Sequence, residues 1–206
     1  MALINTGQVC FCIKRVYVHE DIYDAFLAAF VSFVKTLKSG PPTDAEAVLG
    51  PSQNSMQHAK LLDLYSHVSR EGCNVVLGGE PAAPKTGSGF YLPATVVDNP
   101  PEDSRLVAEE QFGPIVPLLK WSDEDDVLHR ANASLMGLGG SVWSKDVERA
   151  ERLTRRLEAG TVWVNTHFEV GPQAPFGGHK ESGIGVESGL GGLKGWCNAQ
   201  AVLVRK

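Results

Sequence analysis

The sequence has few cysteines and no long apolar run. Its four cysteines, at positions 10, 12, 73 and 197, are too sparse for a disulfide scaffold, and the first two are too close together for an easy bridge. The longest apolar stretch, residues 26–33, is too short to span a bilayer. Residues 1–10 lack the basic start and the long apolar core of a secretory signal. We therefore expect reduced thiols in a cytoplasmic protein with no membrane-spanning helix.

An excess of positive charge is also missing. The 206 residues include 19 Lys and Arg against 24 Asp and Glu, a net charge of -5, with 43% hydrophobic and 21% charged residues. This balance is typical of a slightly acidic globular protein and argues against nucleic acid or an anionic membrane as a partner. The six histidines show no metal-ligand spacing, so no metal site is predicted. The glycines at 137, 139 and 140 lack the strand, loop and helix context of a nucleotide-binding loop.

Strand patterns and helix patterns alternate along the chain. Apolar residues recur at three- and four-residue spacing from residue 22 towards the Gly-Pro-Pro at 40–42, which indicates an unusually apolar amphipathic helix. Further helices are expected over 55–71, 123–133 and 145–158, and strands over 15–19, 74–77, 91–97, 115–121, 140–144 and 161–165. This alternation predicts an α/β fold with a mostly parallel sheet flanked by helices on both faces.

Glycines mark the ends of several of these elements. Gly72 is expected to close the second helix, and Gly160 occupies the position of a helix C-cap before the last strand. Beyond Asn165 the chain is glycine-rich, which favours a surface loop. The apolar residues 199–204 form a strand candidate at the chain end, and such a strand could complete its hydrogen bonds in the sheet of a partner subunit.

Five short segments carry the functional signal. They are NTGQVC at 5–10, EEQFGP at 109–114, GLGGSVWSKD at 137–146, AGTVWVN at 159–165 and PFGGHKESG at 175–183. A lone cysteine is structural more often than catalytic. Together and in this order, however, the five segments resemble the aldehyde dehydrogenase superfamily. The resemblance covers essentially the whole chain, matches the C-terminal part of a full-length member, and implies a catalytic-domain-like region over 1–190 followed by a C-terminal oligomerisation segment over 191–206.

The resemblance implies that Cys10 is the nucleophile. In the family a thiolate attacks the aldehyde, hydride leaves the thiohemiacetal for NAD or NADP, and water hydrolyses the thioester. The backbone N–H of Cys10 would help to hold the oxyanion. The neighbouring Cys12 is read as a passive thiol, and Cys73 and Cys197 are expected in apolar surroundings.

Four further residues match positions that contact the coenzyme in the family. Glu110 corresponds to the carboxylate that binds the nicotinamide ribose, and Phe112 to the ring beside the nicotinamide. Gln57 and Lys60 fall where the adenosine side is often contacted. The alternatives are a solvated acidic turn at Glu109 and Glu110 and an exposed polar helix face. We expect Cys10 to face a carbonyl-sized cleft whose far wall carries the EEQFGP segment.

The glycine-rich loop supplies the residues that resemble a substrate tunnel. Phe176 matches the tunnel aromatic, and Phe168 and Val170 are expected at the same mouth, although aromatic residues in such loops also serve packing. Lys180 is read as a tether of its loop without a role in proton transfer. The implied substrate is a small-molecule aldehyde.

The resemblance also places essential parts of a family member outside these residues. They are the coenzyme-binding sheet, an asparagine of the oxyanion hole and a glutamate general base in an ELGGK-like segment. Two hypotheses follow. The chain is either the catalytic portion of an NAD(P)-dependent aldehyde dehydrogenase that forms a homo-oligomer through its C-terminal strand, or a truncated member that reuses the pocket for non-redox catalysis or the strand for protein interaction.

Overall fold

The computed structural model describes residues 1–81 and 89–206. These residues form two compact units, Met1–Arg130 and Ala131–Lys206. Within the described residues, no helix combines the length and the apolar character that crossing a bilayer requires. The layout expected from the resemblance, with one domain to residue 190 and a segment after it, stays a prediction.

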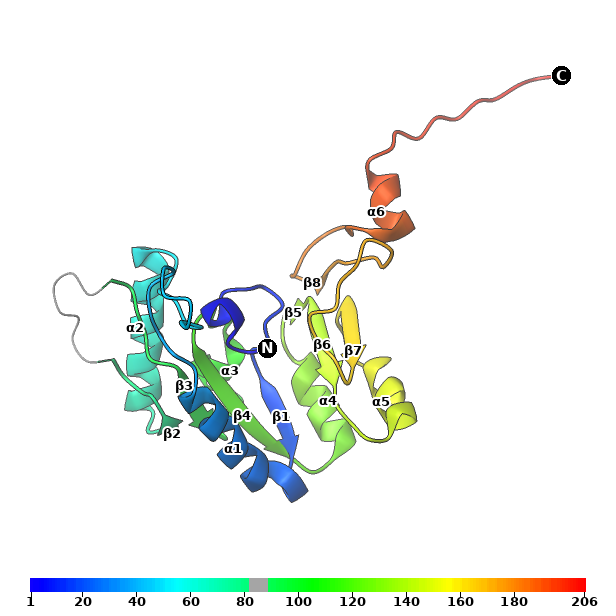
Figure 1. Ribbon diagram of the computed structural model, residues 1–206. Coiled ribbons are helices and arrows are strands. Elements are labelled where there is room, and N and C mark those ends of the chain that lie inside the picture. Colours follow the sequence, from blue (N-terminus) through cyan, green and yellow to red (C-terminus); the bar gives the residue numbers. More distant parts are fainter. Residues whose placement is uncertain (82–88) are drawn as a thin grey trace. The chain divides into compact units, whose positions relative to one another are not determined.

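The first unit is built on a mixed sheet of four strands (Figure 1). The strands are β1 (Val16–His19), β2 (Asn74–Leu77), β3 (Thr95–Asp98) and β4 (Ile115–Trp121), in the order β1-β4-β3-β2. Strands β1 and β3 pair in parallel with β4, and only β2, at one edge, runs antiparallel to its neighbour. The predicted α/β fold with a mostly parallel sheet is therefore confirmed.

Helices cover both faces of this sheet. Side chains alternate between the faces of a strand, and on β3 the adjacent Val96 and Val97 enter two different apolar clusters. Val96 packs in a cluster with Tyr23 of α1 (Glu20–Lys35), and Val97 in a cluster with Leu61 of α2 (Ser55–Arg70). The short α3 (Arg105–Ala108) lies with α2. Burial on both faces explains the unbroken apolar runs of β3 and β4.

Polar caps fix where the two long helices begin. The ring of His19 accepts a hydrogen bond from the Asp21 N–H at 3.3 Å at the start of α1, and Asn54 Oδ1 accepts one from the Gln57 N–H at 2.8 Å at the start of α2. Beyond α2, Gly72 adopts the left-handed conformation with φ of 66°, as its C-terminal position predicts. Helix α1 ends at Lys35, several residues before the Gly-Pro-Pro.

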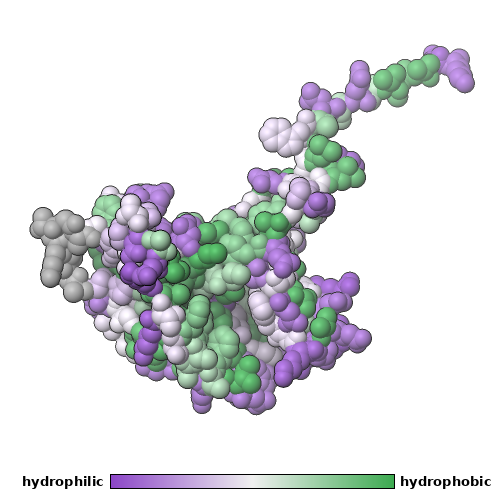
Figure 2. All heavy atoms as spheres, viewed as in Figure 1, coloured by the Kyte–Doolittle hydropathy of each residue, from purple (hydrophilic) through white to green (hydrophobic). Residues whose placement is uncertain are grey.

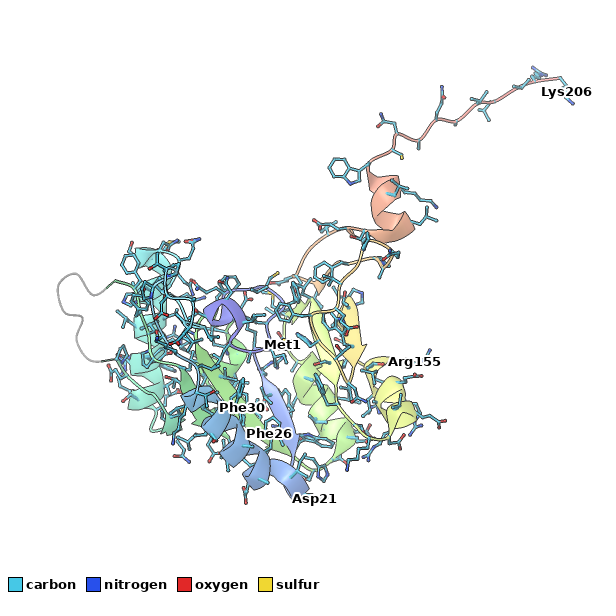
Figure 3. The ribbon with its side chains drawn as sticks, in the orientation of Figure 1. Met1, Asp21, Phe26, Phe30, Arg155 and Lys206 are labelled. Atoms are coloured by element: carbon cyan, nitrogen blue, oxygen red, sulfur yellow. The ribbon has the colours of Figure 1, made fainter. Side chains whose placement is uncertain are left out.

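Helix α1 is apolar on more than its core face. Tyr23 and Val34 are buried beneath it, whereas Ile22 and Phe33 are 57% and 60% exposed. Phe26 and Phe30 stack along the helix with ring centroids 6.0 Å apart (Figure 3). The sequence predicted this unusually apolar helix, and the structure shows that some of its apolar residues lie on the side that faces solvent.

The second unit contains two small pairs of strands. Strands β6 (Gly139–Val142) and β7 (Thr161–Val164) pair in parallel, and α5 (Val147–Thr154) connects them. Strands β5 (Met136–Gly137) and β8 (His179–Lys180) pair antiparallel. Helix α4 (Glu124–Asn132) spans the point where the first unit ends, and α6 (Gly189–Gly195) lies near the C-terminus.

Some expected boundaries were wrong for identifiable reasons. Strand β3 begins at Thr95 and not at residue 91, because the carbonyl of Pro93 accepts the Tyr65 hydroxyl at 2.7 Å and not a strand N–H. Helix α5 ends at Thr154, so Gly160 is not its cap. A side chain at Gly160 is excluded by packing instead, since a Cβ there would lie 1.8 Å from the Gly177 carbonyl oxygen.

The strand expected over 199–204 does not form within the described chain. A strand needs a neighbour to complete its backbone hydrogen bonds, and residues 199–206 have no strand partner among the described residues. Val202, Leu203 and Val204 are 74%, 96% and 80% exposed. Figure 2 shows apolar side chains followed by hydrophilic ones at the C-terminal end. Pairing with a partner subunit stays a prediction.

Candidate active site

A tight turn presents Cys10 to solvent. The Cys12 N–H donates to the Val9 carbonyl at 3.0 Å, which closes a turn with Cys10 at its second position. The Cys10 side chain is exposed. Within the part of the chain that the structure describes, the Cys10 N–H donates no hydrogen bond. The turn therefore leaves both the sulfur and the amide of Cys10 available to a bound molecule.

The two neighbouring thiols differ in their surroundings. Cys12 is buried, and its sulfur lies 3.6 Å from the Ile4 carbonyl oxygen. Burial raises the pKa of the Cys12 thiol, so the reactive thiolate is disfavoured there. Cys73 is partly buried beside the cluster of α2, as expected, but Cys197 is exposed, so the expectation of apolar packing there was wrong. Cys197 follows α6, where few residues surround it.

The segment before the turn is held in an unusual conformation. In the short 3-10 element η1 (Ile4–Gly7), Asn5, Thr6 and Gly7 have φ values of 47°, 61° and 76°. A left-handed conformation is unfavourable for a β-branched residue such as Thr6. The Thr6 hydroxyl offsets this strain, because it accepts from the Gly50 N–H at 2.8 Å and lies 3.3 Å from the Gly50 carbonyl oxygen. The cysteine segment is thus anchored to a distant part of the chain.

Gln8 adds a second anchor that sequence reasoning did not assign. Its amide nitrogen donates to the Pro51 carbonyl at 3.2 Å, and its amide oxygen accepts from the Gln53 N–H at 2.8 Å. The segment that precedes α2 is therefore bonded directly to the residues that precede Cys10. The available sequence signal was a glutamine separated from Cys10 only by Val9.

Two glycines bring the cysteine segment against the EEQFGP segment. A Cβ at Gly7 would lie only 2.3 Å from the Gly113 carbonyl oxygen, so the two backbones touch where neither residue has a side chain. Gly113 is equally confined, since a Cβ there would lie 2.5 Å from Leu61 of α2. The structure therefore places two of the motifs side by side.

The two carboxylates of EEQFGP have different environments. Glu109 pairs with Arg105, with Oε1 2.7 Å from Nε, and Arg105 also pairs with Asp63 at 2.9 Å. Hydrogen bonding from Arg105 holds the pKa of Glu109 below its usual range. Glu110 is exposed, and its carboxylate has no hydrogen bond or ion pair within residues 1–81 and 89–206. Glu109 is thus a structural partner of α3, whereas Glu110 remains open to a ligand.

Gln57 and Lys60 of α2 support the same segment. Gln57 Nε2 donates to the carbonyls of Gln111 and Phe112, both at 3.1 Å, and Lys60 Nζ donates to the Glu110 carbonyl at 3.2 Å. These contacts hold the loop in the conformation in which Phe112 has a φ of 51°. The polar ends of both side chains therefore bind backbone of the loop, and their contact with a coenzyme stays a prediction.

Lys14 joins the two segments and was not singled out by the motifs. Its ammonium donates to the Gly7 carbonyl at 2.7 Å and lies 4.8 Å from the centroid of the Phe112 ring. Burial lowers the pKa of Lys14, while the charges of Cys12, Glu110 and Cys10 act in the opposite direction. In the sequence, Lys14 lies between Ile13 and Arg15, just before the strand pattern that begins at Val16.

The substrate residues predicted from the glycine-rich loop all lie in the second unit. Phe176 is partly buried, and its backbone forms an isolated bridge with Glu187, with N–H to oxygen distances of 2.8 and 2.7 Å. Phe168 has a left-handed φ of 72°, and Val170 is 56% exposed. Their function at a substrate mouth stays a prediction.

Lys180 tethers its loop, as predicted. Its ammonium donates to the carbonyls of Asn132 and Ser134 at 2.6 and 2.9 Å and pairs with Glu158 at 2.7 Å. Ser182, in the same loop, accepts the Gly137 N–H at 2.9 Å. The loop that carries Phe176 is therefore fixed to the segment of β5.

The described residues contain no metal cluster, and the cavity beside α2 does not include Cys10. No group of three or more His, Cys, Asp and Glu side chains there could hold a metal ion. A cavity of about 210 Å³ lies beside α2, but its lining, which includes Tyr65, Thr95 and Ile115, does not include Cys10 or Glu110. The carbonyl-sized cleft expected at Cys10 stays a prediction.

The sequence and the fold match one family throughout. The family model described as the aldehyde dehydrogenase family matches residues 1–202. Aldehyde dehydrogenase LUC3 of Fusarium sp. is 39% identical over 98% of this chain and 42% of its own length, and betaine aldehyde dehydrogenase of Bacillus subtilis is 38% identical over 96% and 41%. The chain thus spans about two-fifths of the length of these relatives.

Solved structures agree with this match. The betaine aldehyde dehydrogenase of Staphylococcus aureus in complex with NAD+ superposes with a TM-score of 0.87 at 34% identity, covering 93% of this chain and 38% of that one. An aldehyde dehydrogenase of Mycobacterium tuberculosis complexed with NAD+ gives a TM-score of 0.87 at 32% identity, covering 94% and 40%. On the extent of these matches, the chain belongs to the aldehyde dehydrogenase family.

Proposed function

We propose that this chain supplies the nucleophile for the NAD(P)-dependent oxidation of an aldehyde to a carboxylic acid, with Cys10 as the attacking thiol. The observation that carries the proposal is the exposed Cys10 on a tight turn whose preceding segment is packed, through Gly7 and Gly113, against the EEQFGP segment. Relatives named as aldehyde dehydrogenases support the reaction class.

The proposed chemistry begins at the sulfur. The Cys10 thiolate forms a bond to the aldehyde carbon, and the electrons of the carbonyl double bond move to its oxygen. In this proposal the N–H of Cys10 donates to that oxyanion, and one such preorganised donor contributes about 3 to 4 kcal/mol in other enzymes. After oxidation, water attacks the thioester, the carbon–sulfur bond breaks, and the carboxylate leaves while the thiol is restored.

The residues of the first unit fit a nicotinamide coenzyme. Glu110 offers an exposed carboxylate that can accept two hydroxyl hydrogen bonds from a ribose. Phe112 offers an aromatic ring on the same loop, whose backbone Gln57 and Lys60 hold. Bound NAD or NADP would supply the acceptor for the hydride that leaves the substrate carbon. The two solved relatives in complex with NAD+ support a coenzyme of this type.

The remaining parts of the proposal concern the substrate and the cell compartment. Phe168, Val170 and Phe176 are proposed to contact the carbon chain of the aldehyde. Free thiols at all four cysteines suit a reducing cytoplasm. The general base and the second oxyanion donor implied by the family resemblance are proposed to come from outside these residues, consistent with the share of the relatives' length that the chain spans.

A second candidate function is assembly through the C-terminal residues. The observation that favours it is the exposure of the apolar stretch from Val202 to Val204. Contiguous apolar side chains in water are unfavourable and often mark a surface that a partner covers. In this alternative the chain associates with a copy of itself through added strands, with or without redox activity.

One experiment decides between thiol chemistry and a role that does not use Cys10. The chain is assayed with a panel of aldehydes and with NAD or NADP, and NAD(P)H formation is followed for the wild type, Cys10→Ala and Cys12→Ala. Turnover that disappears in Cys10→Ala and persists in Cys12→Ala supports the proposal. In the absence of turnover, protection of Cys10 from iodoacetamide by an aldehyde still supports covalent binding, whereas no protection, or turnover that survives Cys10→Ala, contradicts it.

A further inference from the structure

The side of α1 that faces solvent carries an apolar stripe. Its members recur at four- and three-residue steps and are Ile22, Phe26, Ala29 and Phe33. Ile22, Phe26 and Phe33 are 57%, 37% and 60% exposed, and Ala29 is exposed as well. A helix on the surface of a monomer usually has polar residues on this side. Contiguous apolar side chains in water often mark a surface that a partner covers instead.

The spacing of the stripe is that of a seam between two paired helices. In coiled coils, apolar residues at alternating four- and three-residue steps stay on one line along the helix and contact the helix beside it. The sheet of the first unit is packed by a different set of α1 residues, which includes Tyr23, Leu27 and Val34. Helix α1 therefore has one apolar side for its own sheet and a second that the described residues leave exposed.

The aromatic ring near the middle of the stripe is held in place from below. Phe30 is partly buried and packs against the apolar cluster beneath α1, and the Phe26 ring stacks on it with an interplanar angle of 15° (Figure 3). Ordering a side chain on association costs free energy, and a ring that is already ordered avoids part of that cost. Aromatic residues are also enriched among those that contribute most to binding at interfaces. Phe26 is thus a suitable anchor for a contact with another helix.

The charges of α1 have opposite signs at its two ends. Glu20 and Asp21 are exposed in the first turn, and Lys35 is exposed in the last turn. A second copy of α1 in the antiparallel direction would place the acidic start of each helix beside the basic end of the other. A parallel copy would place like charges together at both ends. The charges therefore favour an antiparallel copy of the same helix as the partner of the stripe.

We propose that α1 is a contact surface between two copies of this chain, which pair antiparallel through the stripe. A twofold axis at the midpoint of the stripe would place Phe26 of each copy opposite Ala29 of the other, so a large side chain would meet a small one. One helix face is smaller than a standard interface, so the dimer is expected to be reversible and to depend on concentration. This surface is separate from residues 199–204, and the inference does not depend on aldehyde chemistry.

The test places a charge in the stripe and the same charge beside it. Ala29→Glu lies in the stripe, and Ala28→Glu is the matched control, because Ala28 is also exposed but points about 100° away around the helix. Neither alanine belongs to the apolar cluster beneath α1, so both variants should fold. The full chain carries Leu203→Asp in every sample, which removes any assembly through the C-terminal residues. Sedimentation velocity over a range of concentrations gives the Kd of the dimer.

We expect Ala29→Glu to raise the Kd of the dimer by about tenfold or more, because twofold symmetry brings both introduced carboxylates into the seam. Ala28→Glu should change it by less than about threefold, as an exposed charge does. Equal effects of the two substitutions, or no effect of Ala29→Glu, would overturn the inference. A protein with unchanged α1 that stays monomeric up to about 1 mM would overturn it too, and would leave the stripe to a partner of another sequence.

A charge exchange tests the antiparallel direction. Glu20→Lys combined with Asp21→Lys makes the start of α1 basic like its end, and Lys35→Glu makes the end acidic like the start. In an antiparallel pair each variant alone should associate more weakly than the unchanged helix, and an equal mixture of the two should restore association, because opposite charges then meet at both ends. Variants that associate alone as tightly as the unchanged helix would overturn the antiparallel arrangement.

Discussion

At the scale of single residues, the site depends on places where a side chain is absent. Gly7 has a φ of 76° and would place a Cβ 2.3 Å from the Gly113 carbonyl oxygen. Gly72 has a similar φ of 66° but has open space around its Cβ position. Comparing Gly7 with Gly72 therefore separates the two contributions to stability at Gly7, which are the left-handed backbone conformation and the close contact with Gly113.

We therefore expect Gly7→Ala to lower the free energy of unfolding by roughly 3 kcal/mol or more, because conformational strain and a backbone clash add. Gly72→Ala should cost only about 1 kcal/mol, from conformation alone. Urea unfolding of both variants provides the measurement. Equal losses would mean that the packing of Gly7 on Gly113 contributes nothing to stability.

The same scale shows what motif recognition could and could not supply. The segments around Cys10 and Glu110 were identifiable as sequence motifs, and the structure brings the two segments into contact. The difference between exposed Cys10 and buried Cys12 was not readable, because it depends on the turn closed between Val9 and Cys12. Lys14 was overlooked because its partners, Gly7 and Phe112, are found only once the chain is folded.

At the scale of elements, α1 has two apolar sides with different consequences. Tyr23 is 2% exposed, and its hydroxyl donates to Asp98 Oδ1 at 2.6 Å and lies 3.0 Å from the Leu118 carbonyl oxygen. Phe33, on the outer side, is 60% exposed. Periodicity identifies an apolar helix but does not state which of its apolar residues face the sheet.

We expect Tyr23→Phe to destabilise the chain by about 1 to 2 kcal/mol, because Asp98 Oδ1 loses the hydroxyl that donates to it, whereas the Leu118 carbonyl keeps the Asn99 N–H at 2.7 Å. Phe33→Ser should change the free energy of unfolding by less than about 0.5 kcal/mol, as exposed substitutions usually do. Thermal and urea unfolding measure both. A large loss in Phe33→Ser would show that its ring is covered in solution.

Element boundaries were predictable where an apolar run is uninterrupted. Strands β2 and β4 have the bounds that their sequences predicted. Strand β3 starts later because the Pro93 carbonyl bonds to the Tyr65 side chain. Gly160 allows close packing against Gly177 and does not end a helix. The elements η1 and α3 are too short for periodicity to reveal, and tertiary contacts determine them.

At the scale of the whole molecule, the C-terminal residues contribute little to the fold of a single chain. Residues 198–206 are exposed and form no helix or strand in the described chain. Burial of apolar area is the main source of stability, so a segment that buries little contributes little. The apolar composition of 202–204 therefore requires another explanation, and assembly is the one proposed above.

A chain that ends after Cys197 should melt within about 2 °C of the wild type, because few contacts are lost. If the last residues assemble copies, the shortened chain should also have a lower mass by light scattering. Leu203→Asp is the matched control, since it keeps the length and places a charge where an added strand would be buried. A lower mass in both variants with an unchanged melting temperature assigns the segment to assembly. A large fall in melting temperature would instead show that these residues pack on their own chain, and an unchanged oligomer would place the contact between copies on another surface.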